Sequence, residues 1–325
     1  MELLDGFNRK INYLRLSVTD LCNLRCRYCM PEGGVPKLDH ADILSYEEML
    51  CLAEAAVALG VEKIRITGGE PLVRKGLVPF LERLSALNGL RELVLTTNAV
   101  LLPKMAAELR AAGVQRVNIS LDSLQPERFS RITRCGDLSE VLAGIAAAES
   151  VGFPVKLNVV VMRGINDDEI EEFAALTLEK DYSVRFIEYM PNIQDPQWLN
   201  QVVSGQEILE RIGRKYAYRS LGRDELCGPS QDYRIEGAAG SFGVITPVFD
   251  HFCKECNRIR VTSTGQVRSC LFSENQVDLK PFLQKGDRHG VQKTLLDIVK
   301  GKAAGHHIQE GQEKKSAFSM SSIGG

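Results

Sequence analysis

The chain has 325 residues, 44% of them hydrophobic and 25% charged, which is typical of a globular protein with one or two domains. Its 40 basic and 42 acidic side chains give a formal net charge of -2. This balance excludes a global field that would attract nucleic acid or an anionic membrane, so an anionic substrate would need local Arg and Lys side chains. The N-terminus has no basic segment followed by an apolar run, and no stretch is long enough to span a bilayer, so we expect a cytoplasmic protein.

From residue 11 to about 190, short runs of β-branched residues alternate with longer amphipathic stretches. This alternation predicts repeated βα units and a parallel sheet. The six predicted strands lie at 13–18, 63–67, 92–97, 116–121, 155–162 and 184–190. Periodicity alone is compatible both with an open doubly wound sheet and with an incomplete barrel.

The segments between the strands carry clear helix boundaries. Ser45 followed by Glu48 predicts a capping box, and Gly60 predicts the end of the same helix. In either architecture, ligands bind beyond the C-terminal ends of the parallel strands. We therefore expect the site at the edge formed by residues 67–71, 96–98, 120–122 and 188–190.

After about residue 195 the pattern changes to a helical stretch at 205–216, followed by short strands. These strands are predicted around Tyr233, Val244, Ile259 and Val267. We predict two regions, a core of residues 1–220 and a smaller α+β extension of residues 221–325. The last 25 residues, from Gly301, have few apolar side chains, so we expect a flexible tail.

Six of the nine cysteines fall into two tight clusters rather than being spread as a disulfide framework would spread them. This distribution indicates metal ligands in a reducing compartment. Cys51, Cys135 and Cys227 stand alone, and we expect each to be a small buried hydrophobic residue.

The first cluster is Cys22, Cys26 and Cys29, which follow the first predicted strand with the spacing CxxxCxxC. A structural zinc site is closed by four protein ligands, whereas a four-iron cluster held by three cysteines leaves one iron open. An open iron is what catalysis needs. The spacing, with Tyr28 just before the last cysteine, resembles that of the radical S-adenosylmethionine superfamily.

That resemblance implies that the open iron chelates S-adenosylmethionine, whose reductive cleavage yields a 5'-deoxyadenosyl radical that abstracts a hydrogen atom. Residues 68–71 resemble the GGEP motif of the superfamily, in which backbone near Gly69 contacts the methionine amino group. Two glycines at the end of a strand let a ligand approach the backbone closely. Together with Tyr28 and Gly69, Ser120 and Met190 match positions that bind the cofactor in related proteins.

The second cluster is Cys253, Cys256 and Cys270, and its three ligands again suggest an open iron. The alternative is a zinc site that uses His251 or Cys227 as the fourth ligand.

Between the ligands of the second cluster, alternation in a strand would place Arg258 and Arg260 on one face. Two guanidiniums beside a metal indicate an anion clamp, because arginine offers fixed multiple donors to phosphate oxygens. A solvated surface strand is the alternative interpretation.

The two triplets and several longer segments together resemble GTP 3',8-cyclase, the family of molybdenum cofactor biosynthesis protein A. The matching segments are 14–33, 64–76, 95–98, 117–124, 164–170, 185–191, 252–272 and the terminal Gly324 and Gly325. The resemblance covers nearly the whole chain. It implies an α/β fold, namely an incomplete (β/α)6 TIM-type barrel with a smaller C-terminal α+β extension that carries a second iron-sulfur cluster.

In that family, the second cluster binds the guanine ring of GTP, and basic residues hold the triphosphate and ribose. The matching positions are Arg15, Arg65, Thr96, Lys156, Arg258 and Arg260. Basic residues buried on strands are costly unless they meet an anion, but they would be unremarkable if they faced solvent at an edge. Alternation does not fix which way Arg15, Arg65 and Lys156 face.

The resemblance further implies the reaction, in which the ribose C3' hydrogen is abstracted and the carbon radical attacks guanine C8. The product is (8S)-3',8-cyclo-7,8-dihydroguanosine 5'-triphosphate, and the reaction is the first step of molybdenum cofactor biosynthesis. The implied cofactors are two [4Fe-4S] clusters and S-adenosylmethionine. The implied partners are a second copy in a homodimer, an electron donor and a downstream pterin-forming synthase, and the Gly324-Gly325 end is implied to reach the active site.

Three positions depart from the family pattern without touching a ligand position: Leu21, Ala99, which stands where glycine is usual, and Cys135. Two other functions are compatible with parts of this pattern. One is a radical enzyme with an auxiliary cluster that acts on a peptide, and the other is a non-catalytic zinc or iron-sulfur module. The Arg258 and Arg260 pair favours a nucleotide substrate.

Overall fold

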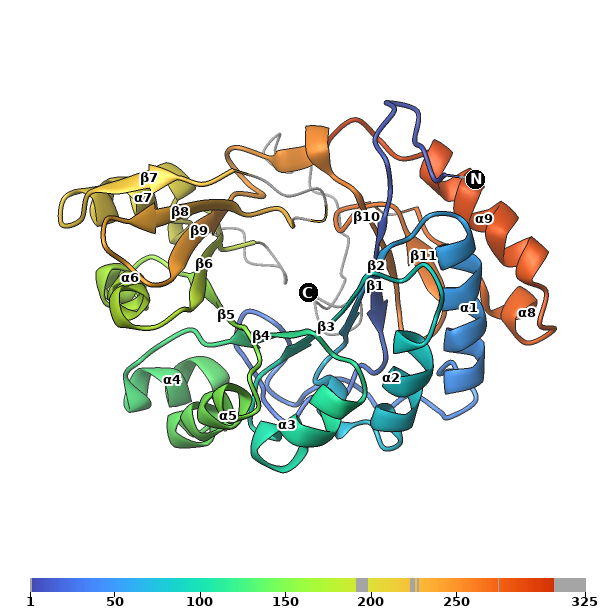
Figure 1. Cartoon of the computed structure of the whole chain (residues 1–325), viewed down its shortest axis with the longest axis horizontal. Coiled ribbons are helices and arrows are strands. Elements are labelled where there is room, and N and C mark those ends of the chain that lie inside the picture. The colour runs from blue at the N-terminus through green and yellow to red at the C-terminus, as the bar shows by residue number, and fades with distance from the viewer. Residues whose placement is uncertain (1, 191–197, 223–225, 227, 274, 307–325) are drawn as a thin grey trace.

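The computed structural model describes residues 2–190, 198–222, 226, 228–273 and 275–306. Their strands form one twelve-stranded sheet in the order β12-β11-β10-β1-β2-β3-β4-β5-β6-β9-β8-β7. The sheet curves in an open arc with the helices on its outer side (Figure 1). Its end strands β12 and β7 are not paired with each other, so the barrel is incomplete, as predicted.

All six predicted parallel strands are present. They are β1 (Tyr13–Ser17), β2 (Lys63–Thr67), β3 (Glu92–Thr97), β4 (Arg116–Ser120), β5 (Val155–Val161) and β6 (Ser183–Glu188). The helices between them are α1 (Tyr46–Ala58), α2 (Leu77–Ser85), α3 (Leu102–Ala111), α4 (Pro126–Thr133), α5 (Leu138–Ser150) and α6 (Ile170–Glu179). A short 3-10 helix, Pro71–Val73, directly follows the β2 loop.

Local sequence explains where these helices begin. At the start of α1, the Glu48 backbone N–H donates to the Ser45 hydroxyl (3.1 Å), and the Ser45 N–H donates to the Glu48 carboxylate (2.6 Å). This reciprocal pair satisfies two N–H groups that have no partner within the helix, and it confirms the predicted capping box.

The C-terminal extension continues the barrel sheet at both edges. β9 (Ser241–Ile245) pairs in parallel with β6, and β10 (Arg258–Val261) pairs in parallel with β1. The remaining elements are β7 (Tyr218–Ser220), β8 (Gln231–Ile235), β11 (Gln266–Arg268), β12 (Val277–Asp278), α7 (Gly205–Gly213), α8 (Lys280–Leu283) and α9 (Arg288–Lys300). Because β10 lies beside β1, the segment that follows Cys253 and Cys256 is a strand of the barrel sheet.

The two faces of the sheet differ in composition. One face carries apolar side chains such as Leu14, Ile66, Val117 and Phe186, which join the helices in a continuous core. Residues at alternate positions of the same strands lie on the opposite, concave face. That face is largely polar, and it carries the candidate site.

The chain beyond α9 differs from the predicted flexible tail. Lys302 is only 4% exposed, and its ammonium donates to the Arg258 carbonyl (3.1 Å) and to the Ser269 carbonyl. The prediction is therefore wrong for residues 302–306, because a buried ammonium fixes this stretch against β10. Residues 307–325, including Gly324 and Gly325, lie outside the described part of the chain.

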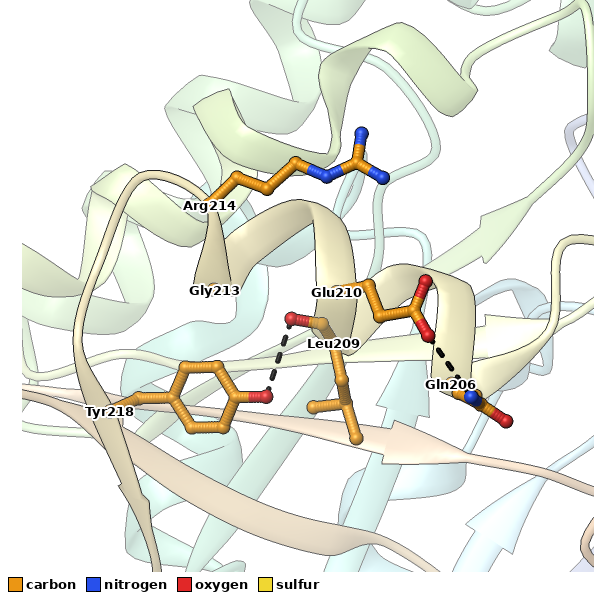
Figure 2. A pocket seen from close by; sticks show the side chains of 6 residues that line it. All are labelled: Gln206, Leu209, Glu210, Gly213, Arg214 and Tyr218. Carbon is orange, nitrogen blue, oxygen red and sulfur yellow. Dashed lines mark hydrogen bonds between the residues drawn. The ribbon is translucent and has the colours of Figure 1, made fainter.

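A hollow of about 620 Å³ lies on the outer side of the extension, between α7 and Tyr218 (Figure 2). Within it, the Tyr218 hydroxyl donates to the Leu209 carbonyl (3.3 Å), and the Gln206 amide donates to Glu210 (3.0 Å). It contains none of the residues predicted to bind a cofactor or substrate. Among the described helices, none is long and apolar enough to cross a membrane.

Candidate active site

Strand register places the predicted basic residues on the concave face. Arg15 is paired with Arg65 on one side and with Arg260 on the other, and Arg258 is paired with Tyr13. Register partners point to the same side of a sheet, and so do residues two apart in one strand. All four arginines therefore face the interior of the arc, which settles the facing that alternation left open.

Strands β3, β4 and β5 place the other predicted residues on the same concave face. Thr96 on β3 is paired with Asn118 on β4, and Asn118 with Lys156 on β5. Ser120, two residues beyond Asn118, is paired with Asn158. The predicted substrate and cofactor residues of the barrel therefore share one concave surface.

Sequence reasoning missed three further basic residues on this face: Lys63, Arg116 and Arg185. Lys63 and Arg116 both contact Glu92, at 2.5 and 3.0 Å, and Arg185 contacts Asp232 at 3.1 Å. Their signal was the alternation of basic and apolar residues within 63–67, 116–120 and 183–188, read together with the register. The two carboxylates balance only part of the positive charge.

The concentrated charge changes the acidity of its members. Burial, together with the charges of Arg185 and Arg116, lowers the pKa of Lys156 to about 7. Burial and the neighbouring Arg258 lower the pKa of Arg260 to about 10. Burial opposes ionisation of Tyr13, yet Arg65 and Arg15 lower its pKa to about 8. A polyanion bound here would relieve the repulsion among these cations.

Several buried polar atoms of this face have no hydrogen-bond partner in the described part of the chain. They include the Thr96 hydroxyl oxygen, the Asn118 side-chain oxygen and the Arg65 Nε atom. Buried polar groups nearly always have a hydrogen-bond partner, so these unpaired atoms indicate a polar ligand. A ligand with many acceptor oxygens, such as a polyphosphate, fits the unpaired Thr96 and Arg65 donors and the positive charge of this face.

The first cysteine triplet lies in the loop after β1. The Cys29 N–H donates to the Cys26 carbonyl (2.9 Å), and the Leu24 N–H donates to the Cys22 sulfur (3.4 Å). Burial raises the pKa of Cys22 to about 11 and that of Cys26 well above its usual value, and their mutual charges add to the effect on Cys26. Thiols gathered in this way become thiolates only with a cation between them, which fits an iron-sulfur cluster.

Glu70 of the GGEP segment is a buried carboxylate that accepts hydrogen bonds from the residues around this loop. It accepts hydrogen bonds from the Leu72 N–H (3.0 Å), the Thr97 hydroxyl (2.9 Å) and the Asn98 N–H (2.7 Å). Burial raises its pKa to about 7, and the three donors oppose that rise. The Asn98 amide in turn lies 3.9 Å from the Cys22 sulfur, so Glu70 positions a neighbour of the cluster ligand.

The two glycines of the same segment lie in close contact with the chain's own backbone. A Cβ atom on Gly69 would lie 2.3 Å from the Leu21 carbonyl oxygen, and one on Gly68 would lie 2.4 Å from that of Thr19. The Gly69 N–H donates to the Thr19 carbonyl (2.8 Å). The glycines therefore allow the close approach of segment 19–21, which leads into Cys22, while the contact of Gly69 with the cofactor stays a prediction.

The remaining predicted cofactor residues lie around this loop. The Tyr28 hydroxyl donates to buried Asp122 (2.7 Å), and burial raises the pKa of that carboxyl to about 6. Met190 and Cys29 both pack against Leu271, the residue after Cys270. This contact joins the first cysteine triplet to the second, so the two triplets border one interior.

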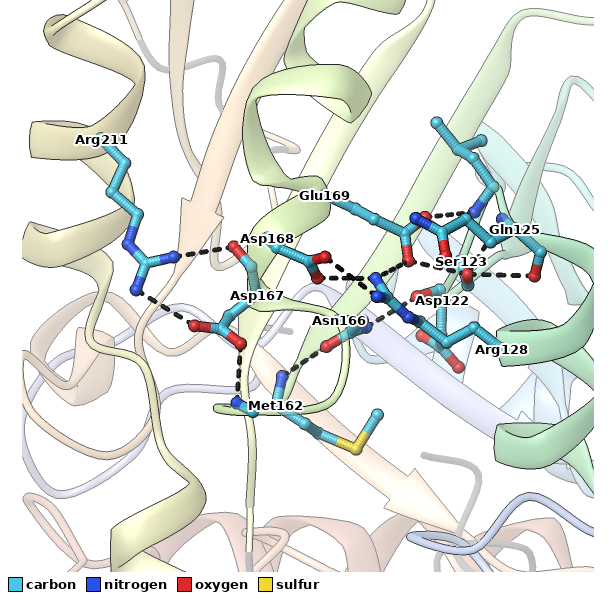
Figure 3. Close-up of polar contacts among 12 residues, drawn as sticks. Asp122, Ser123, Gln125, Arg128, Met162, Asn166, Asp167, Asp168, Glu169 and Arg211 are labelled. Carbon is cyan, nitrogen blue, oxygen red and sulfur yellow. Dashed lines mark hydrogen bonds and ion pairs between the residues drawn. The ribbon is translucent and has the colours of Figure 1, made fainter.

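The loop after β5 supports Asp122 through a network that sequence reasoning left without a role (Figure 3). The Asn166 amide donates to the Asp122 carbonyl (2.7 Å) and the Val160 carbonyl (2.9 Å). Arg128 contacts both Asp168 and Glu169 at 2.6 Å. The network fixes the ends of β4 and β5 relative to each other.

In the second triplet, Cys253 lies in the 3-10 helix Phe252–Glu255, Cys256 directly follows that helix, and Cys270 follows β11. Burial opposes ionisation of Cys256, yet the charges of Arg258 and Lys302 lower its pKa to about 6. Burial raises the pKa of Cys253, and the charges of Cys270 and Cys256 add to that rise. The donor set is three thiols beside two cations, which fits a cluster with an open iron.

Of the two alternative zinc ligands, His251 lies in the described part of the chain and Cys227 does not. The His251 ring lies 4.9 Å from the ring of His306, and Cys227 lies outside the described residues. Within the described ranges, no three His, Cys, Asp or Glu side chains lie close enough together to hold a single metal ion such as zinc. Of the isolated cysteines, Cys51 is half-buried against the core, but Cys135 is exposed, so the prediction of a buried residue is wrong there. The loop that holds Cys135 lies against the segment of the first cysteine triplet, not against the core packed by the helices.

The partial barrel and the cysteine loop after its first strand define the class of the protein as a radical S-adenosylmethionine enzyme. The family model described as Radical SAM superfamily matches residues 16–177, and the one described as Molybdenum Cofactor Synthesis C matches residues 182–308. The crystal structure of Streptococcus suis SuiB shares the fold, with a TM-score of 0.58 and 14% identity over 90% of this chain and 67% of that one.

Full-length relatives narrow the assignment. The chain is 58% identical to GTP 3',8-cyclase of Geobacter sulfurreducens over 100% of both chains. It is 48% identical to GTP 3',8-cyclase of Peptoclostridium acidaminophilum over 99% of this chain and 98% of that one. The chain belongs to the GTP 3',8-cyclase family.

Proposed function

We propose that this protein converts GTP into (8S)-3',8-cyclo-7,8-dihydroguanosine 5'-triphosphate, the first step of molybdenum cofactor biosynthesis. The observation that carries the proposal is the positively charged concave face that lies between two cysteine triplets. A triphosphate matches the charge of this face. The family of the chain supplies the reaction.

Cys22, Cys26 and Cys29 would hold the first [4Fe-4S] cluster, with one iron left for S-adenosylmethionine. When bound, the cluster and this cofactor supply the 5'-deoxyadenosyl radical that starts the reaction. The protein's part is to hold the cofactor through Tyr28, Gly69, Ser120 and Met190 at the open side of the loop. Water is excluded and the reacting carbon is oriented by the surrounding strand ends.

The substrate's phosphates would be held by the basic residues of the concave face. We assign this role to Arg15, Arg65, Lys156, Arg258 and Arg260, with Thr96 as a neutral donor toward the ribose. Forked guanidinium groups bind phosphate oxygens in fixed directions, so they set the orientation of the nucleotide as well as its affinity. Lys63 and Arg185 lie on the same face and strengthen the field.

Cys253, Cys256 and Cys270 would hold a second [4Fe-4S] cluster whose open iron binds the guanine ring. Base at one end and phosphates at the other would leave the ribose facing the first cluster. This arrangement turns recognition of the whole nucleotide into the correct position for one hydrogen abstraction.

The remaining assignments extend the family resemblance. We propose a cytoplasmic homodimer that accepts electrons from a separate reductant and passes its product to a pterin-forming synthase. We also propose that the chain is organised in two regions, residues 1–220 and residues 221–325. Sedimentation of the anaerobic protein tests the dimer directly.

The deciding experiment is reductive cleavage of S-adenosylmethionine by the anaerobic, iron-reconstituted protein with GTP, with ATP or without nucleotide. We expect formation of 5'-deoxyadenosine to be stimulated strongly by GTP and far less by ATP. Cleavage that ignores GTP would retain the radical core but refute the substrate. Absence of cleavage by fully loaded protein would refute the radical assignment itself.

A further inference from the structure

A buried arginine near the N-terminus contacts parts of the chain that are distant in sequence. Arg9 is 9% exposed and precedes β1 by only a few residues. Its guanidinium donates to the carbonyl of Cys253 (2.5 Å), which is 244 residues away. It also donates to the carbonyls of Ala304 (2.9 Å) and Ala303 (2.6 Å). One side chain therefore joins a cysteine loop to the segment beyond α9.

Asp5 fixes this guanidinium in place. Its carboxylate accepts from the Arg9 Nε atom (2.5 Å), from the Arg9 backbone N–H (2.9 Å) and from the Phe7 N–H (2.9 Å). Burial disfavours the charged carboxylate, but the hydrogen bonds from Arg9 hold the pKa of Asp5 below its usual value. With Nε held by Asp5, the two terminal nitrogens are directed at the three carbonyl oxygens.

The segment that Arg9 holds lies directly over a ligand of the second cluster. The His306 backbone N–H hydrogen-bonds the Cys253 sulfur. A Cβ atom on Gly305 would lie 3.7 Å from that of Cys253. Lys302 binds the carbonyl of Ser269, which is next to Cys270, and that of Arg258, two residues after Cys256. The stretch 302–306 thus touches all three parts of the second cysteine site.

We propose that Arg9, oriented by Asp5, is a positioning residue for the second iron-sulfur cluster. It fixes the Cys253 loop and residues 303–306 against each other, so that the three sulfurs face one cluster and the His306 N–H reaches the Cys253 sulfur. Hydrogen bonds to cluster sulfurs and ligand orientation set cluster retention and reduction potential. The inference rests on the second cluster proposed above.

The test compares Arg9→Gln with Lys10→Gln in the full-length, anaerobically reconstituted protein. Lys10 is the adjacent residue and pairs with the exposed Glu2 and the half-buried Glu62, so its variant controls for loss of charge in this segment. Iron content, Mössbauer spectra and electron paramagnetic resonance of the reduced protein distinguish the two clusters. Thermal unfolding monitors the fold.

We expect Arg9→Gln to fall from about eight irons per chain to about four, with loss of the second cluster's spectrum only. The spectral change that S-adenosylmethionine causes in the first cluster should persist, as should the cleavage measured without GTP. Lys10→Gln should match the unmodified protein. Arg9→Lys should not restore the second cluster, because a single ammonium cannot serve Asp5 and three carbonyls together.

Arg9→Gln protein that keeps about eight irons and the second cluster's spectrum would overturn the proposal, and so would equal loss of both clusters. If Arg9→Gln does not fold, Asp5→Asn provides the same test, since it frees the guanidinium without removing it. Unmodified protein with only about four irons would instead refute the second cluster and the proposed function that depends on it.

Discussion

Lys156 shows how the concave face sets the properties of a single residue. It lies on β5 among Arg185, Arg116 and Lys63, whose charges add to burial in lowering its pKa to about 7. A lysine that loses its proton near neutrality contributes a variable charge to an anion site. The site would therefore change its charge with pH when it is empty and hold it constant when a polyanion is bound.

This property predicts proton uptake on GTP binding. Above pH 7 the empty site contains neutral Lys156, and a bound triphosphate favours the ammonium, so binding takes up a proton from solution. GTP affinity should then fall with rising pH, by up to about tenfold per pH unit. Calorimetric titration at about pH 7.5 in buffers of different ionisation enthalpy measures the uptake. Lys156→Arg keeps the charge and should abolish it, and equal uptake by both proteins would contradict the assignment.

Ala99 follows β3 where the family usually has glycine, and its backbone explains that preference. Its φ is +68°, in the left-handed region that favours glycine, and the residue is fully buried. The carbonyl of Ala99 also lies where a Cβ atom of Gly144 would be, so α5 packs closely on this turn. The chain accepts backbone strain here within a tightly packed contact.

We expect Ala99→Gly to raise the free energy of unfolding by about 0.5–1 kcal/mol. Relief of about 1–2 kcal/mol of left-handed strain exceeds the added flexibility of glycine in the unfolded chain. Urea unfolding under anaerobic conditions measures the change. Ala106→Gly, the same substitution inside α3, should instead lower stability by about 1 kcal/mol. A loss of stability in both variants would show that the buried methyl group of Ala99 matters more than its strain.

At the scale of elements, the cysteine loop after β1 depends on the turn after β2. Gly68 and Gly69 admit the backbone of residues 19–21, and Glu70 orders Asn98 beside Cys22. The GGEP motif therefore supports the loop that carries Cys22, and under the proposed function it also borders the cofactor site. Substitutions there should disturb cluster binding before they disturb the fold.

Gly69→Ala tests this dependence. The added methyl group would meet the backbone of Leu21 and Asp20 at 2.3 and 2.6 Å, so segment 19–21 must move and carry Cys22 with it. We expect iron at the first site to fall and cleavage of S-adenosylmethionine to drop at least about tenfold, with little change in the second cluster's spectrum. Gly33→Ala, whose methyl group would have no neighbour within 4 Å, is the matched control. Normal iron and cleavage in Gly69→Ala would refute the supporting role.

At the scale of the whole molecule, the extension completes the site rather than adding a separate one. β10 and β9 extend the barrel sheet at its two edges, and Leu271 packs against Cys29 and Met190. The two cysteine triplets therefore share one interior lined by basic side chains. Their functions should nevertheless be separable, because each has its own ligands.

Removing one ligand from each triplet tests this division. Cys26→Ala should abolish cleavage of S-adenosylmethionine, because the cofactor loses its cluster. Cys256→Ala should retain the slow cleavage seen without nucleotide but lose its stimulation by GTP. Each variant should hold about half the iron of the unmodified protein. GTP stimulation in Cys256→Ala would show that the second triplet does not bind the substrate.

The sequence by itself determined the six βα units, the capped helices and both cysteine triplets, because these depend on spacing and periodicity within short segments. It also determined the family, through motifs that extend over nearly the whole chain. It did not determine that Arg15, Arg65 and Lys156 face inward. Alternation separates the two faces of a strand, and only the helices packed on the apolar face decide which face lies inside.

Tertiary structure alone decided which distant segments meet. The contact of Arg9 with Cys253 joins two segments 244 residues apart, and Lys302 is buried in a stretch whose composition predicted a flexible tail. Cys135, expected to be buried, lies exposed because its loop borders the cluster segment rather than the core. Hydrogen bonds of this kind depend on the pairing of β10 beside β1, which brings the two ends of the chain together, and no local pattern records them.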